Sequence, residues 1–181
     1  LCLQDWGRAI IVGDETTFGK GTYQVFTLSS HNKDQINPQG EYKVTRGMYY
    51  TVGGKTPQCT GVKADIKIPG ILSELKLGEK FTSFPIENDT IEANFKDSLK
   101  DIHPLYRNKV KKIYEINQQK QIEEYKALVP LLLKRSKYRI KENKNYQQFL
   151  KTLKNESLTD EQYESFKKQD LQLIEAQNVL K

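Results

Sequence analysis

Hydrophobic and polar positions alternate with two different periods along the chain. In the first part, apolar residues form short runs rich in β-branched and aromatic side chains, which are typical of strands. The predicted strands cover residues 9–12, 22–28, 42–52 and 61–69. Beyond Pro104 apolar residues recur every three or four positions, which is typical of amphipathic helices. We therefore predict an α+β fold in which an all-helical part follows a β-rich part.

Local signals mark several helix ends. Residues 1–6 are predicted to be the last turn of a helix, which Gly7 ends by adopting a left-handed conformation. Pro130 should kink or divide the long helical region that contains it. The spacing of Thr159 and Gln162 resembles a capping box, which predicts the start of a last helix.

A polar stretch around Pro85 separates the two parts. We expect a β-rich unit over residues 1–80, a linker over 81–100 and a helical domain over 101–181. The chain begins without methionine, and we interpret it as a piece of a longer protein. It contains no apolar run long enough to predict a transmembrane helix.

Positive charge is concentrated in the helical part. The 181 residues include 29 Lys and Arg against 23 Asp and Glu, and residues 107–154 hold 14 basic and 4 acidic side chains. Such a region can bind nucleic acid or an anionic membrane. Because the basic residues alternate with glutamates and glutamines at helical spacing, a solvated helix surface is the simpler interpretation.

One lysine, Lys20, lies between Gly19 and Gly21 in the loop after the first predicted strand. Glycines on both sides predict that the backbone is closely packed and the lysine partly desolvated, and burial favours the neutral amine that can act as a base. A simple turn with a solvated lysine is the alternative. A phosphate-binding loop is excluded, because five residues separate Gly13 from Gly19 and the residue after the lysine is neither serine nor threonine.

A lysine base in a serine peptidase requires a nucleophile and a group that orients the amine. Gln24 is a candidate for the orienting group. In a fully extended strand it would lie ~13 Å from Lys20, so contact requires a bend, for which Gly21 is suited.

Cysteine and histidine do not suggest a metal site. Cys2, Cys59, His31 and His103 lie far apart in the sequence and lack the short paired spacings of zinc sites. We therefore expect no metal and no cofactor. Whether the two cysteines form a disulfide depends on a distance that the sequence does not give.

Several motifs together resemble the catalytic segment of the carboxyl-terminal processing peptidases, or tail-specific proteases. These are Gln4-Asp5-Trp6-Gly7-Arg8, Thr17-Phe18-Gly19-Lys20-Gly21-Thr22 with Gln24, and the later block Gly53-Gly54, Gln58, Gly61-Val62 and Asp65-Ile66. Residues 84–95 and the helical region are similar to the long, periplasmic subgroup of this family. The resemblance implies that residues 1–80 are the C-terminal part of a serine-peptidase core, β-rich with one entering helix.

By this resemblance Lys20 matches the general base and Gln24 the residue that positions it. The nucleophilic serine is implied upstream of Leu1, together with a PDZ domain that captures substrate tails. The implied partners are proteins or peptides with free C-termini, the N-terminal portion of the same protein and a possible second copy, without nucleic acid or metal. The implied location is the periplasm. The alternative function is a non-catalytic, basic helical interaction module, and a dimerisation or regulatory role of the helical domain also stays open.

Overall fold

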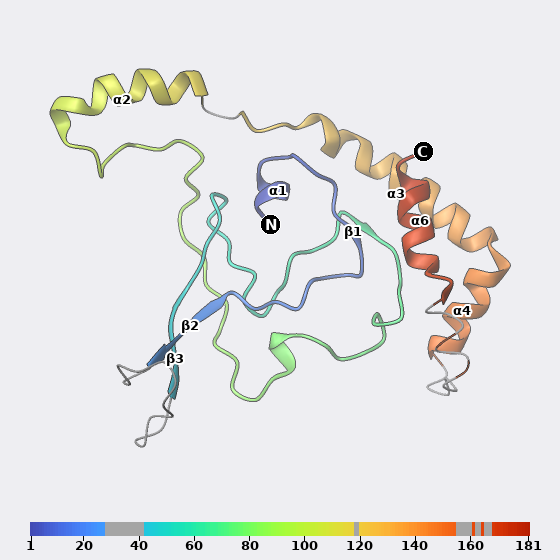
Figure 1. Ribbon diagram of the computed structural model, residues 1–181. Coiled ribbons are helices and arrows are strands. Elements are labelled where there is room, and N and C mark those ends of the chain that lie inside the picture. The colour runs from blue at the N-terminus through green and yellow to red at the C-terminus, as the bar shows by residue number, and fades with distance from the viewer. Residues whose placement is uncertain (28–41, 118–119, 155–160, 162–163, 165–167) are drawn as a thin grey trace.

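The computed structural model describes residues 1–27, 42–117, 120–154, 161, 164 and 168–181. Short strands occupy the first part of the chain and the longer helices occupy the second part (Figure 1). This order of elements is consistent with the predicted α+β class. In chain order the elements are α1 (Cys2–Asp5), β1 (Val12–Gly13), β2 (Thr22–Thr27), β3 (Tyr42–Met48), β4 (Ile66–Lys67), η1 (Glu79–Phe81), α2 (Pro104–Asn117), α3 (Glu124–Glu142), α4 (Lys144–Lys154) and α6 (Leu171–Val179).

The end of α1 is confirmed where the sequence predicts it. Gly7 has a φ of +64°, its N–H donates to the Gln4 carbonyl at 3.0 Å, and the Arg8 N–H donates to the Leu3 carbonyl at 2.8 Å. This pair of bonds satisfies the last carbonyls of the helix. Glycine is required for a second reason, because a Cβ at this position would lie 1.7 Å from the Ile122 carbonyl oxygen.

The strands form two separate pairs. β2 and β3 are antiparallel, and their register shifts between Tyr23 and Gln24. β1 and β4 are parallel, with Val12 opposite Ile66. Both are shorter than the sequence predicts. The Asp65 carboxylate accepts the Ile11 N–H at 2.7 Å, so a side chain replaces a strand partner at the beginning of β1.

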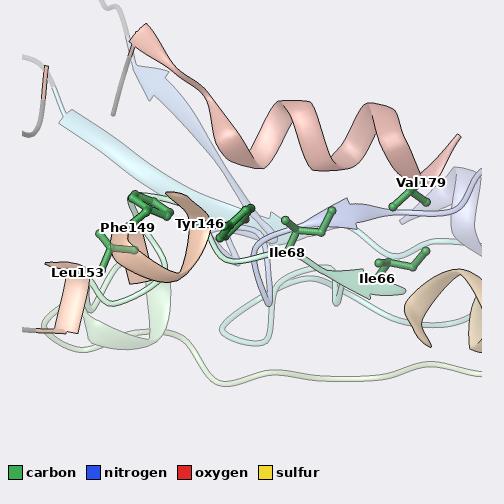
Figure 2. Packing of buried hydrophobic residues seen from close by; sticks show 6 residues of the cluster. All are labelled: Ile66, Ile68, Tyr146, Phe149, Leu153 and Val179. Atoms are coloured by element: carbon green, nitrogen blue, oxygen red, sulfur yellow. The ribbon is translucent and has the colours of Figure 1, made fainter. Parts of the chain in front are cut away.

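A compact apolar cluster joins the short parallel pair to the C-terminal helices. Ile66 and Ile68 are fully buried, and Figure 2 shows them with Tyr146, Phe149, Leu153 and Val179. α3 contacts β4, and α6 contacts β1. The proposed linker therefore connects two segments that share one hydrophobic cluster, and the division into domains stays a prediction.

Polar contacts reinforce this packing. The Tyr146 hydroxyl donates to the Pro69 carbonyl at 2.6 Å, and burial raises the pKa of Tyr146. Arg139 on α3 and Glu175 on α6 form a bidentate ion pair, with Nη2 2.8 Å from Oε1 and Nε 3.2 Å from Oε2. Because Glu175 is buried, this pair fixes the two helices relative to each other.

The helical region is divided before Pro130 and not at it, so of the two predicted effects of this proline only the kink stays a prediction. α2 ends at Asn117 and α3 begins at Glu124, whereas α3 continues through Pro130. Val129 and Leu132, on both sides of this proline, pack against the apolar cluster, and this packing offsets the hydrogen bond that proline removes.

The C-terminal end of the last predicted helix is found as α6. α6 begins after Asp170, whose carboxylate accepts the Leu173 N–H at 2.9 Å. The expected capping residues Thr159 and Gln162 lie outside the described residues. Within the described part of the chain, every helix is too short or too polar to cross a bilayer.

Candidate active site

The glycines beside Lys20 allow the loop before β2 to lie against neighbouring backbone. Gly19 has a φ of +89°, and a Cβ built on it would lie 3.1 Å from the Gly61 nitrogen. A Cβ on Gly21 would lie 2.2 Å from Thr56 Oγ1. The close backbone packing predicted from these glycines is therefore confirmed.

A buried glutamine of the neighbouring segment also binds this loop. Gln58 is fully buried, and its Oε1 accepts the Gly21 N–H at 2.8 Å. Its Nε2 donates to the Ile86 carbonyl at 2.9 Å and lies 3.5 Å from Glu79 Oε1. Because both ends of the amide are used, the position of the Lys20 backbone is fixed by directional hydrogen bonds.

The side chain of Lys20 projects from this fixed backbone into an open pocket. Its Nζ donates to Thr22 Oγ1 at 3.0 Å and lies 3.8 Å from Glu79 Oε1. The lysine side chain is 43% exposed, so it is partly covered and its amine remains open to the pocket. The glycines enclose the main chain of the loop, but they do not cover the side chain.

Gln24 approaches Lys20 through an intermediate group. Gln24 Nε2 donates to Thr22 Oγ1 at 3.3 Å and to Thr45 Oγ1 at 3.2 Å. Among the described residues no hydrogen bond joins Gln24 directly to Lys20. The three side chains meet because positions 20, 22 and 24 lie on one face of the strand and its start.

Thr22, Glu79 and Gln58 are contacts of the site to which sequence analysis gave no role beside Lys20. The alternation of a strand could have identified Thr22, because it lies midway between two candidate residues. No local signal points to Glu79, which is 59 positions away and reaches the loop through η1. The Glu79 N–H donates to the Phe18 carbonyl at 2.8 Å.

A pocket of about 480 Å³ is lined by both the amino end of α1 and this loop. Its walls are residues 1–3, the loop residues 17–20, residues 49–51 after β3, and Pro57 with Val62. Most of these side chains are apolar or aromatic, and Lys20 is the charged residue among them. The pocket can therefore receive a largely apolar chain segment beside one amine.

Charge near the rim of the pocket is fixed by one strong hydrogen bond. The Tyr50 hydroxyl donates to Asp89 Oδ2 at 2.8 Å. This bond lowers the pKa of Asp89 and raises the pKa of Tyr50. The lowered pKa keeps Asp89 ionised. Asp89 does not line the pocket itself, but its hydrogen bond orients the ring of Tyr50, which does.

Of the remaining candidate groups, Cys2 lines the pocket, Cys59 and His103 do not, and His31 lies outside the described residues. Cys2 and Cys59 are both free thiols in the described chain, and Cys59 Sγ donates to the Ile86 carbonyl at 3.1 Å. Within the described residues, no three His, Cys, Asp or Glu side chains are grouped as metal ligands.

Comparison with known proteins gives the relationship of the chain. Residues 1–68 match the family model of peptidase family S41. The tail-specific protease of Haemophilus influenzae is 39% identical over 79 residues, which are 42% of this chain and 11% of that protein. This chain is a relative of the carboxyl-terminal processing peptidases. The resemblance found in the sequence is confirmed, and the chain spans about a tenth of the length of this curated relative.

The matched residues contain most of the site described above, whereas Glu79 lies beyond them. Lys20, Gln24 and Gln58 all lie within residues 1–68, as do α1 and the four strands. The helices from α2 onwards lie beyond the family match, although α3 and α6 pack against matched strands. The part of the chain that is similar to peptidases is therefore also the part that forms the pocket.

Proposed function

We propose that this chain contributes the general base, Lys20, to a serine peptidase of the Ser–Lys type. The main support for this proposal is that the amino end of α1 and Lys20 line the same pocket, within the residues that match a peptidase family. The serine belongs to the segment that precedes Leu1 in the full protein. We place this nucleophile a few residues before Leu1, next to the part of the pocket wall that residues 1–3 form.

The proposed reaction uses the pocket as follows. The neutral Lys20 amine takes the proton of the serine hydroxyl as its oxygen attacks a peptide carbonyl. The C–N bond breaks, the protonated lysine returns the proton to the leaving amine, and an acyl-enzyme forms. Water, activated by the same amine, then hydrolyses the ester. Gln24 supports the direction of the amine throughout, and no metal or cofactor takes part.

The family relationship supports a substrate class. Proteins that present free C-terminal tails are the proposed substrates, because the matched relative is named a tail-specific protease. The N-terminal portion of the same protein is the proposed partner and carries the serine and a tail-binding PDZ domain. We also propose a periplasmic location, as the resemblance implies.

The test is peptide hydrolysis by the full-length protein with Lys20→Ala. Loss of a positioned base should lower kcat by about 10² to 10⁴-fold. Exposed Lys76 provides the matched control, because Lys76→Ala removes the same side chain outside the pocket and should leave kcat unchanged. Normal hydrolysis by the Lys20→Ala protein would refute the assignment.

A further inference from the structure

We propose that Thr22 is a positioning residue that transmits the effect of Gln24 to Lys20. The inference rests on the proposed role of Lys20 as base. It is supported by a further observation: the Thr22 hydroxyl lies between the amine and the amide, at 3.0 Å from Lys20 Nζ and 3.3 Å from Gln24 Nε2.

The Thr22 side chain is well suited to hold a fixed direction. It is 7% exposed, and β-branching restricts its χ1 angle. Its strand is paired with β3, where Thr22 is opposite Met48. In contrast, the Lys20 side chain is flexible and 43% exposed, so it takes its direction from the group to which it bonds.

The chemistry of a hydroxyl fits a base that changes its protonation state. A hydroxyl has two acceptor lone pairs and one hydrogen to donate. Gln24 Nε2 uses one lone pair. The other lone pair accepts an N–H from Lys20 Nζ in both the neutral and the protonated state, which leaves the single lone pair of the neutral amine free for the serine proton. The Gln24 atom that contacts Thr22 is the amide nitrogen, which only donates and so offers the ammonium no acceptor.

The first test compares variants of Thr22 in the full-length protein. Thr22→Val keeps the shape and removes the hydroxyl, and misplacement of the base should lower kcat by about 10²-fold with little change in KM. Thr22→Ser should restore most of kcat. Thr152→Val on α4 is the matched control, because it removes a hydroxyl hydrogen bond far from the pocket. If Thr22→Val does not fold, Thr22→Ala is compared with Thr22→Ser.

The second test measures whether Gln24 acts through Thr22. If it does, Gln24→Ala lowers kcat in the wild-type background but has little further effect in the Thr22→Val background, since both changes interrupt one connection. Effects that multiply would overturn the inference, as would a Thr22→Ser protein that is folded and no more active than Thr22→Val.

The Lys20→Ala protein separates the two levels of the proposal. If it is inactive while Thr22→Val is fully active, Lys20 is the base and Thr22 does not position it. If Lys20→Ala retains normal kcat, both the proposed function and this inference are wrong. The inference therefore stands only when both single variants lose activity and the Gln24 effect is not additive.

Discussion

The Lys20 loop and the apolar cluster on β1 and β4 are held by different forces. Around the loop the buried side chains are polar, with Thr22, Thr56 and Gln58 each less than 8% exposed. Around β4 the buried side chains are mainly apolar, and they include Ile66, Phe149 and Val179 (Figure 2). Hydrogen bonds depend on direction, whereas apolar packing depends mainly on volume. The region proposed for chemistry is thus the one whose geometry depends on particular atoms.

The largest expected effect is on the apolar side of this comparison. Phe149 is 3% exposed and touches the Tyr146 ring edge-on, with centroids 5.8 Å apart. Phe149→Ala should lower the free energy of unfolding by about 3–5 kcal/mol, through lost burial and the cavity that remains. Denaturant unfolding measures this. Leu105→Ala on α2 is the control, because Leu105 is 82% exposed, and an equal loss there would contradict the assigned core.

A smaller effect is expected from the polar side. Gln58→Leu preserves volume but leaves the Gly21 N–H and the Ile86 carbonyl without this partner, which should cost about 1–3 kcal/mol. Amide hydrogen exchange at Gly21 should become faster. Ile68→Val sharpens the comparison, since it should cost about 0.5–1.5 kcal/mol and leave exchange at Gly21 unchanged. Unchanged exchange in Gln58→Leu would show that the loop does not depend on this amide.

The smallest effect combines both kinds of force in Tyr146. Tyr146→Phe keeps the ring and loses the bond to the Pro69 carbonyl, at a cost of about 1 kcal/mol near neutral pH. Burial raises the pKa of Tyr146 above its ordinary value of 10.0, so the folded protein keeps a proton that the unfolded chain loses. The stability supplied by this hydroxyl is fully present below pH 10.0 and falls as pH rises above it.

The measurement is the unfolding free energy of both proteins across that pH range. The difference between wild type and Tyr146→Phe should narrow above pH 10.0, because phenylalanine has no proton to lose. A constant difference up to strongly alkaline pH would mean that the hydroxyl is not buried in solution.

The sequence predicts the features that depend on neighbouring residues. Gly7 ends α1 through its own backbone conformation, and the glycines around Lys20 predict the close approach of the loop. The pairing of β2 with β3 agrees with alternating strand-forming residues. In each case the signal and the structure lie within a few positions of each other.

The sequence does not predict features that depend on distant residues. The helix continues through Pro130 because its neighbours pack on β4, which lies more than 60 positions earlier. Glu79 and Gln58 reach the Lys20 loop through separate turns of the chain. The exposure of Lys20 also depends on which side chains cover it, and glycine spacing describes only its backbone.

The most direct test of the central claim is a crystal structure of the full-length protein with a peptide bound in the pocket beside Lys20. The account predicts a serine just before α1 whose hydroxyl lies within hydrogen-bond reach of Lys20 Nζ, about 2.6–3.2 Å. It also predicts that Thr22 Oγ1 still contacts that nitrogen. A pocket that holds the peptide with no serine near Lys20, or with its amine turned away, would contradict the account.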